Sequence, residues 1–457
     1  MCSISGFLRY GSGSASCEVA DQLIALLERS SERGRDSAGV IAVTRSGVLR
    51  SAKQARPKSF EYVREVIDDE VTVLIANNRA EPTTEFVTAK TPEDIQPFVS
   101  QHVAVTHNGV IANDREISLT YDLNPASSID TAVLPPLIER LGVRGALAQV
   151  LGSYALAVCD TRTPYRLYLA CNYKPVYLMN DLSNGILWFG SQEEYLRPEQ
   201  DIWSQLTQPA VVEMPPYSML EIDGDGFRVR ETTLQPRERG KRAFIVCSGG
   251  LDSTVTAAWA QRQGYEITLL HFRYGCRAEG REVEAVKAIA KALDCPYRIE
   301  DLSWLGQLGG NPLTDSTIPL HENEAGAEFA HEWVPARNFV FSALAAALCD
   351  RFGHDTIMLG LNLEEGGAYP DNTGLFYRAI DTVCNIGTTS RPSIICPLAN
   401  KVKHEIIEIG LEVNAPFHLS WSCYENGPYH CGKCGPCYMR KQAFKMNGVK
   451  DPTVYIC

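Results

Sequence analysis

The sequence predicts two domains of different class, an α+β domain followed by an α/β domain. Short apolar runs rich in β-branched and aromatic residues fill the first part of the chain, whereas strand and helix patterns alternate in the second. Between them, residues 235–242 carry five charges in eight positions and give way abruptly to an apolar run. We therefore expect domains at 1–234 and 243–457, joined by a linker at 235–242.

The first domain shows more strands than helices. The clearest helix is expected at 20–29, where four apolar residues form a stripe, and a second at 131–141. Together these elements indicate α+β layers. The expected strands, bounded by Gly, Pro, Asn and Asp, are 71–76, 103–106, 154–159, 167–170 and 211–214.

In the second domain, a strand at 243–247, a helix at 254–263, a strand at 267–272 and a helix at 281–293 follow one another. This alternation predicts a parallel sheet covered by helices. The turn after the first strand reads Ser-Gly-Gly-Leu-Asp-Ser at 248–253. Its glycines expose backbone N–H groups and the helix that follows adds partial positive charge, so the turn predicts an anion site.

This turn resembles the pyrophosphate loop of the ATP pyrophosphatase (PP-loop) superfamily, whose Rossmann-like domains split ATP into AMP and pyrophosphate while adenylating a substrate. Further blocks resemble the QueC family of 7-cyano-7-deazaguanine synthases over nearly all of 241–457. That family activates 7-carboxy-7-deazaguanine with ATP and adds ammonia, forming first an amide and then the nitrile preQ0. The blocks are FIVCSGGLDST, IEDLSWLGQLGGNPLTDSTIP, VPARN, YPD, CPLANKVKHEI and WSCYENGPYHCGKCGPC.

The QueC resemblance implies a role for each matching residue. Lys403 would offset negative charge in the transition state, and Mg²⁺ would accompany the ATP phosphates. The residues implied to bind ATP are Ser248, Gly249, Gly250, Leu251, Asp252, Ser253, Arg337 and Asn338, and those implied at the deazaguanine pocket are Tyr369, Pro370, Asp371 and Phe376.

Two stretches depart from the family pattern. Tyr-Gly-Cys-Arg-Ala at 274–278 lacks the usual glutamine and histidine, and Gly-Gly-Ala at 366–368, with Leu375, replaces an aromatic residue and a carboxylate. Because these residues are lost, the sequence leaves open whether the acceptor and its nitrogen donor are those of the QueC family.

Four cysteines near the C-terminus have the spacing C-x7-C-x2-C-x2-C. Four thiolates closing on one ion match a structural tetrahedral zinc site, although an iron–sulfur cluster also uses four cysteines. The QueC resemblance favours zinc. The ligands would be Cys423, Cys431, Cys434 and Cys437.

Removal of Met1 would leave Cys2 with a free α-amine able to take the proton of its own thiol. Further blocks at 32–39, 78–80, 107–110, 130–131 and 152–155 resemble, with Cys2, a class II glutamine amidotransferase with an Ntn-type αββα fold. The resemblance implies Cys2 as nucleophile and Asn108 with Gly109 as oxyanion hole. Arg79 would bind the glutamine carboxylate and Asp130 its amine. The family commonly has glycine after this cysteine, and we expect the serine found here at position 3 to narrow the glutamine site.

The leading interpretation is a glutamine- and ATP-dependent enzyme that converts 7-carboxy-7-deazaguanine to preQ0, with Zn²⁺ and Mg²⁺ bound. Two alternatives stay open: addition of ammonia to preQ0, giving an archaeosine-type amidine in tRNA or phage DNA, and conjugation of the activated base to a protein amine. A homodimer and a macromolecular acceptor stay open too. The formal charge of −12 argues against a large nucleic-acid surface, and without an apolar run of ~20 residues or a signal-peptide pattern a cytoplasmic protein is expected.

Overall fold

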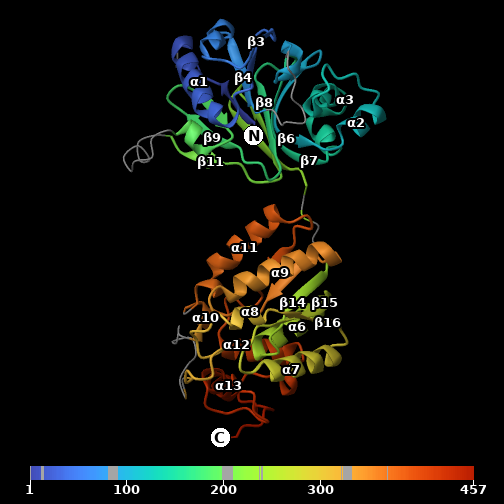
Figure 1. Ribbon diagram of the computed structural model, residues 1–457, viewed down its shortest axis with the longest axis vertical. Coiled ribbons are helices and arrows are strands. Elements are labelled where there is room, and N and C mark those ends of the chain that lie inside the picture. Colours follow the sequence, from blue (N-terminus) through green and yellow to red (C-terminus); the bar gives the residue numbers. More distant parts are fainter. Residues whose placement is uncertain are drawn as a thin grey trace. The chain divides into compact units, whose positions relative to one another are not determined.

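The structure is a computed structural model that describes residues 2–11, 15–80, 91–197, 209–235, 237, 240–320, 322, 332–367 and 369–456. The chain divides into two compact units, Met1–Pro236 and Arg237–Cys457 (Figure 1). This division falls inside the charged stretch 235–242.

The N-terminal unit contains two antiparallel sheets. In its described part, one sheet has seven strands in the order β11-β9-β10-β1-β4-β2-β3, and the other has six in the order β13-β12-β8-β7-β6-β5. The strands are β1 (Ser3–Arg9), β2 (Ser37–Thr44), β3 (Leu49–Ala55), β4 (Val71–Arg79), β5 (Phe98–Val99), β6 (Val103–Ile111), β7 (Gly152–Asp160), β8 (Arg166–Cys171), β9 (Tyr177–Asp181), β10 (Ile186–Gly190), β11 (Val211–Glu213), β12 (Ser218–Asp223) and β13 (Arg228–Thr233). The helices and 3₁₀ turns are α1 (Ser16–Ser30), η1 (Ser31–Arg33), η2 (Glu61–Val66), η4 (Pro92–Asp94), α2 (Asp114–Thr120), η5 (Asp130–Val133), α3 (Leu134–Leu147) and α4 (Glu193–Leu196).

Alternation along β1 shows how the layers form. Ile4 and Leu8 are buried in the core between the two sheets, whereas Phe7, on the opposite face, packs with Leu23 of α1. The second sheet is covered by α3, whose Leu137 belongs to a separate buried cluster. Figure 1 shows α1 and α3 on opposite sides of the paired sheets. The expected αββα sandwich is confirmed, and the helix expected at 20–29 lies within α1.

The C-terminal unit is built on a parallel sheet. Among the described residues this sheet has five strands in the order β16-β15-β14-β17-β18. The strands are β14 (Arg242–Val246), β15 (Glu266–Arg273), β16 (Tyr297–Asp301), β17 (Thr356–Leu359) and β18 (Ser393–Ile395). The helices and 3₁₀ turns are α6 (Leu251–Arg262), α7 (Glu279–Ala292), α8 (Ser303–Gly306), α9 (Arg337–Phe352), α10 (Leu363–Gly366), η8 (Pro370–Asn372), α11 (Gly374–Gly387), α12 (Lys403–Glu412), η9 (Phe417–Leu419) and α13 (Gly435–Met446).

Helices cover both faces of this sheet. Phe244 of β14 packs in the cluster that includes residues of α9 and α11, and Ile245, its neighbour in the strand, packs with α6 and α7. The chain runs from β14 outward to β15 and β16 and then returns to β17 on the other side of β14. The order of strands therefore reverses between β14 and β17, and ligands of such sheets bind at the carboxyl ends of the strands beside that point. The predicted parallel α/β domain is confirmed.

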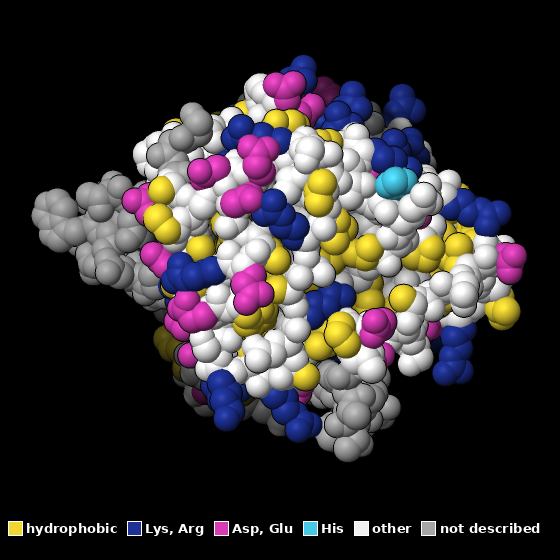
Figure 2. Space-filling model, turned by 90° about the horizontal axis from the view of Figure 1, so that it is seen from above, with side chains coloured by type: hydrophobic (Ala, Val, Ile, Leu, Met, Phe, Trp, Pro, Cys, Tyr) yellow, Lys and Arg dark blue, Asp and Glu magenta, His cyan; other side chains and the backbone are white. Residues whose placement is uncertain are grey.

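The surface is mixed in character. Figure 2 shows Lys and Arg side chains interspersed with Asp and Glu side chains on the face in view. No helix within the described ranges is both long enough and apolar enough to cross a bilayer.

Candidate active sites

The Ser-Gly-Gly-Leu-Asp-Ser turn at 248–253, here called the phosphate-type loop, lies where β14 ends and α6 begins, next to the reversal point of the sheet. Gly249 has φ +80°, and a Cβ added there would lie 2.9 Å from the carbonyl oxygen of Glu282 and 2.9 Å from the Cβ of Ala285. The carbonyl oxygen of Gly249 accepts a 2.8 Å hydrogen bond from the backbone N–H of Trp421. Only glycine fits this position without strain or displacement of α7.

Two hydroxyl groups tie the loop together. Ser248 Oγ accepts a hydrogen bond from the backbone N–H of Gly250 at 3.2 Å and lies 3.3 Å from Ser253 Oγ. Ser253 Oγ donates to the carbonyl oxygen of Gly250, also at 3.2 Å. The loop is therefore held in its turn before any ligand arrives.

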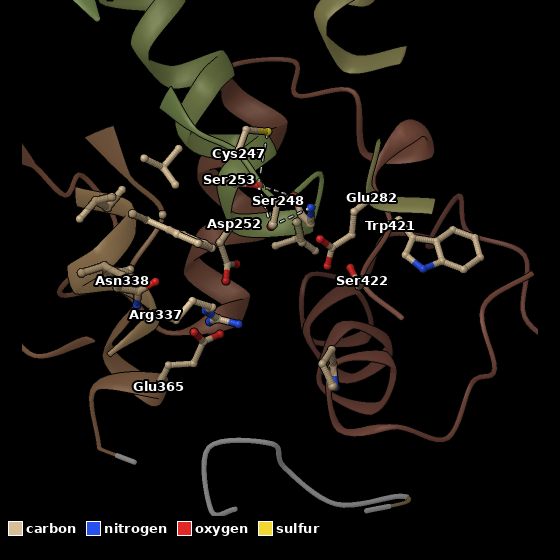
Figure 3. A pocket seen from close by; sticks show the side chains of 18 of the residues that line it. Cys247, Ser248, Asp252, Ser253, Glu282, Arg337, Asn338, Glu365, Trp421 and Ser422 are labelled. Atoms are coloured by element: carbon tan, nitrogen blue, oxygen red, sulfur yellow. Dashed lines mark hydrogen bonds between the residues drawn. The ribbon is translucent and has the colours of Figure 1, made fainter. Parts of the chain in front are cut away.

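A cavity of about 200 Å³ opens in front of this loop (Figure 3). Its walls come from the loop, β15, α7, α9, α10, α12 and the segment that carries the cysteine cluster. The ATP-binding residues expected from the sequence, apart from Gly249, line this cavity. Residues from 248 to 440 thus meet in one pocket.

The charge at the floor of the cavity is arranged around Lys403. Its Nζ donates to Asp252 Oδ2 at 2.6 Å and lies 3.7 Å from Glu365 Oε1, while Asn362 Nδ2 donates to the same Asp252 oxygen at 3.0 Å. Burial raises the pKa of Asp252, and the charge of Lys403 opposes that effect. Asp252 Oδ1 is buried with no hydrogen-bond partner among the described residues. This oxygen suits a hard cation such as Mg²⁺, which prefers carboxylate and phosphate ligands.

Arg337 and Asn338 begin α9 and both line the cavity. Arg337 Nη1 donates to the hydroxyl of Tyr274 at 3.3 Å, and the guanidinium lies 5.7 Å from the centre of the Tyr274 ring. The backbone N–H of Asn338 donates to Asp371 Oδ2 at 2.9 Å. Asp371 thus satisfies a donor in the first turn of α9 that has no partner within the helix.

The four residues expected at a deazaguanine pocket lie beside the cavity without lining it. Tyr369 and Asp371 are buried, and Phe376 packs against the hydrophobic cluster under α9. Pro370 opens η8, the turn that brings Asn372 to the cavity wall. Their role in binding the base stays a prediction. Ala368 and Met1 lie outside the described residues.

The four C-terminal cysteines form one cluster. The Sγ atoms of Cys423, Cys431, Cys434 and Cys437 all lie within 4.8 Å of one another. Backbone N–H groups donate to two of these sulfurs. Cys423 Sγ accepts from the N–H of Cys431 at 3.3 Å, and Cys431 Sγ accepts from the N–H of Cys434 at 3.3 Å. Four sulfurs around one zinc ion at ~2.3 Å would be ~3.8 Å apart, so the set fits a tetrahedral structural zinc site.

A second group of candidate residues surrounds Cys2 in the N-terminal unit. Cys2 Sγ lies 3.7 Å from the carbonyl oxygen of Ala80, just after the buried Arg79 that ends β4. Burial raises the pKa of the Cys2 thiol, while the nearby charge of Arg79 lowers it and that of Asp130 raises it. The Asp130 carboxylate accepts hydrogen bonds from the backbone N–H of Ile111 at 2.7 Å and from that of Thr131 at 2.6 Å. Cys2, Arg79 and Asp130 are thus brought within electrostatic reach of one another.

Asn108 and Gly109 lie in β6, paired with β7, and do not form a hairpin turn. Asn108 is buried, and a Cβ added to Gly109 would lie 1.9 Å from the carbonyl oxygen of Ser153. Next to them, His107 Nδ1 is 2.8 Å from Thr131 Oγ1, which ties β6 to the residue after Asp130.

The expectation for Ser3 was wrong. Its hydroxyl donates to the carbonyl oxygen of Ser30 at 3.5 Å, at the end of α1. Side chains of a strand alternate between faces, so Ser3 faces α1 while Ile4 faces the inner core. The Ser3 side chain therefore does not narrow the surroundings of Cys2.

Several cavity residues were missed from the sequence. Glu282 and Glu365 follow the carboxyl ends of strands, which is the signal that a parallel sheet offers. Trp421 and Tyr424 flank the first cysteine of the cluster and were treated only as part of that motif.

Comparisons with known proteins match a different family to each of the two units. The family described as "Queuosine biosynthesis protein QueC" matches residues 242–448, and the "Glutamine amidotransferase domain" family matches residues 83–198. A 7-cyano-7-deazaguanine synthase of Sulfolobus acidocaldarius is 42% identical over 469 residues, covering 100% of both chains. The chain belongs to the 7-cyano-7-deazaguanine synthase family.

Other members of the 7-cyano-7-deazaguanine synthase family are similar to different extents. The enzyme named 7-cyano-7-deazaguanine synthase 2 of Sulfurisphaera tokodaii is 43% identical over 468 residues and 100% of both chains. That of Methanocaldococcus jannaschii is 40% identical over 230 residues, which is 47% of this chain and 99% of the relative. Among solved structures, one titled "Structure of the allosteric regulatory enzyme of purine biosynthesis" has 17% identity and a TM-score of 0.40, covering 99% of this chain and 96% of that one. As a family member, the chain is an enzyme that forms carbon–nitrogen bonds.

Proposed function

We propose that this enzyme converts 7-carboxy-7-deazaguanine to 7-cyano-7-deazaguanine, using ATP to activate the carboxylate and glutamine as the source of ammonia. Residues 1–234 would release ammonia and residues 243–457 would consume it, joined by the linker 235–242. The observation that carries the proposal is the phosphate-type loop, which shares one cavity with Arg337 and the Asp252–Lys403 pair. Relatives named 7-cyano-7-deazaguanine synthase over the whole chain support it.

In the cavity, the backbone N–H groups of the loop would hold the ATP phosphates, since exposed N–H groups at a helix start attract anions. Asp252 would hold Mg²⁺, which supplies charge neutralisation at the phosphates when bound. Lys403, fixed by Asp252, would offset the negative charge that develops as pyrophosphate leaves. Adenylation turns a poor electrophile, the carboxylate, into one with a good leaving group. Ser248 and Ser253, with Gly250, would position the phosphates, and Arg337 with Asn338 would contact the nucleotide or the adenylate.

In the N-terminal unit, removal of Met1 would give Cys2 the free amine that activates its thiol for attack on the glutamine amide. The Asn108 side chain and the Gly109 N–H would donate to the developing oxyanion. The charges of Arg79 and Asp130, which already act on Cys2, support a site for the carboxylate and amine of glutamine.

The zinc ion that fits the cysteine cluster would be structural. Trp421, Tyr424 and Arg440 reach the cavity from the segment that the cluster ties together. Metal binding would therefore complete one wall of the pocket.

The test is a single reaction followed by mass spectrometry. Purified protein is mixed with 7-carboxy-7-deazaguanine, Mg·ATP and glutamine labelled in the amide nitrogen. A labelled nitrile supports the proposal, and the absence of any nitrile with either glutamine or ammonium refutes it. An amidine formed from preQ0, or a mass shift on a protein, would instead support one of the two alternatives.

A further inference from the structure

The cavity contains a third carboxylate that the proposed roles leave unused. Glu282, in the first turn of α7, lines the cavity, and Figure 3 shows its carboxylate directed into it. The other two acids, Asp252 and Glu365, both lie within 4 Å of Lys403 Nζ. No ion pair of Glu282 occurs within the described part of the chain. Of these three acids, Glu282 is thus the one without an ion pair among the described residues.

The surroundings of Glu282 suit proton exchange near neutrality. Burial raises its pKa to about 7, against the opposing effects of the Arg337 charge and a hydrogen bond with Cys276. A Cβ added at Gly249 would lie 2.9 Å from the backbone carbonyl oxygen of Glu282, so this turn of α7 lies close against the phosphate-type loop. A general base works best when its pKa lies near the pH of the reaction. The titratable or charged groups that act on Glu282, or on which it acts, are Arg337, Tyr274, Cys276, Glu279 and Cys247.

The chemistry requires such a base. When ammonia attacks the adenylated carboxyl carbon, the new nitrogen carries a positive charge and must lose a proton before AMP leaves cleanly. The later dehydration of the amide requires the two remaining N–H protons to leave, the last as the nitrile forms. Lys403 is protonated, because its pKa is raised on balance by Asp252 and Glu365 although burial opposes this. It cannot accept either proton.

We propose that Glu282 is the catalytic base that takes the proton from the attacking nitrogen in this cavity. The inference rests on the proposed function and adds a residue to it. In the first step the C–N bond forms, the carboxylate of Glu282 receives one N–H proton, and the C–O bond to AMP breaks with its electron pair going to the phosphate oxygen. In the second step, another ATP adenylates the amide oxygen, which releases pyrophosphate and one N–H proton to solvent. The neutral adenylated amide then gives its last N–H proton to Glu282, and its C–O bond breaks with the electron pair going to AMP, which leaves the C≡N group. Solvent removes the proton between steps.

The experiment separates activation from amination in the full-length protein. Glu282→Gln keeps the shape of the side chain and removes the base, and Glu284→Gln on the exposed face of α7 is the matched control. Carboxylate-dependent ATP–pyrophosphate exchange reports adenylation, which needs no proton from nitrogen. Nitrile and amide formation from saturating ammonium reports the proposed step. The rates of exchange and of nitrile formation are both measured at pH values from about 5.5 to about 9, which bracket the pH range in which a general base near neutrality titrates.

We expect Glu282→Gln to retain exchange and to lower nitrile formation by ~10²-fold or more, the usual contribution of a general base. The wild-type rate should fall below about pH 7, where Glu282 becomes protonated, and this limb should vanish in the variant. Glu282→Asp should restore part of the activity and the limb. Equal loss of exchange and amination, or a wild-type rate in Glu282→Gln, would overturn the assignment. Failure of the wild-type protein to form nitrile at all would instead refute the proposed function.

Discussion

Replacement of Gly249 by alanine tests whether the phosphate-type loop needs the conformation seen here. Gly249 has φ +80°, where an alanine costs ~1–2 kcal/mol. Its new Cβ would also lie 2.9 Å from the Glu282 carbonyl oxygen and the Ala285 Cβ, and overpacking of this kind costs ~1–3 kcal/mol. The sum is ~2–5 kcal/mol, concentrated at the loop. If ATP binds only the native loop, the lower figure already weakens ATP binding by about 30-fold.

The matched control is Gly448→Ala, at the end of α13. Gly448 has φ +64° but has nothing within 4 Å of an added Cβ, so it isolates the conformational cost from the steric one. Carboxylate-dependent ATP–pyrophosphate exchange as a function of ATP concentration is the assay, with thermal unfolding measured in parallel. We expect Gly249→Ala to raise the apparent ATP constant strongly and Gly448→Ala to leave it unchanged. Equal exchange in the two variants would refute the argument that the loop must keep its left-handed residue.

Three further predictions concern the other sites. Cys2→Ala should abolish product formation from glutamine but not from ammonium, and if this variant still used labelled glutamine, the assignment of Cys2 as nucleophile would be contradicted. Asn108→Ala should lower the glutamine-dependent kcat by ~10²–10³-fold. Chelation of zinc should stop ATP–pyrophosphate exchange, because the cysteine-bearing segment forms a cavity wall, and added zinc should restore it; exchange that survives in metal-free protein would speak against this. Arg440→Met should lower the stability of the C-terminal unit by ~3–5 kcal/mol, because it removes the buried partner of the half-buried Asp451, 3.1 Å away. Burial alone would raise the pKa of Asp451, but Arg440 lowers it on balance. The stabilisation that the pair gives is therefore full above about pH 4 and is lost as the pH falls below that value. An unchanged Tm in Arg440→Met would contradict the prediction.

Features that depend on neighbours in the chain were predictable. The helix stripe at 20–29, the strand–loop–helix around 248–253 and the cysteine spacing all place their residues by local geometry, and the structure contains each of them. The change at the linker from a strand-rich α+β pattern to alternating strands and helices was predictable for the same reason, because strand and helix periods are local properties.

Features that depend on distant parts of the chain were not. The failure of the Ser3 expectation arose because the face to which a strand residue points depends on which element packs there. The residues expected at the deazaguanine pocket, around 369–376, come from the resemblance and their role stays a prediction, whereas the hydrogen bond from Asn338 to Asp371 at the start of α9 was visible only in the fold.

What the sequence determined by itself was the class of each domain, the glycine-containing loop at 248–253, the cysteine cluster and the types of residue that chemistry needs. What only the tertiary structure decided was which charges meet. Lys403 and Asp252 are 151 positions apart in sequence yet 2.6 Å apart in space, and Glu282 faces the same cavity. The physical reason is that a parallel sheet gathers the carboxyl ends of its strands at one edge, so residues far apart in the chain share one buried, low-dielectric pocket.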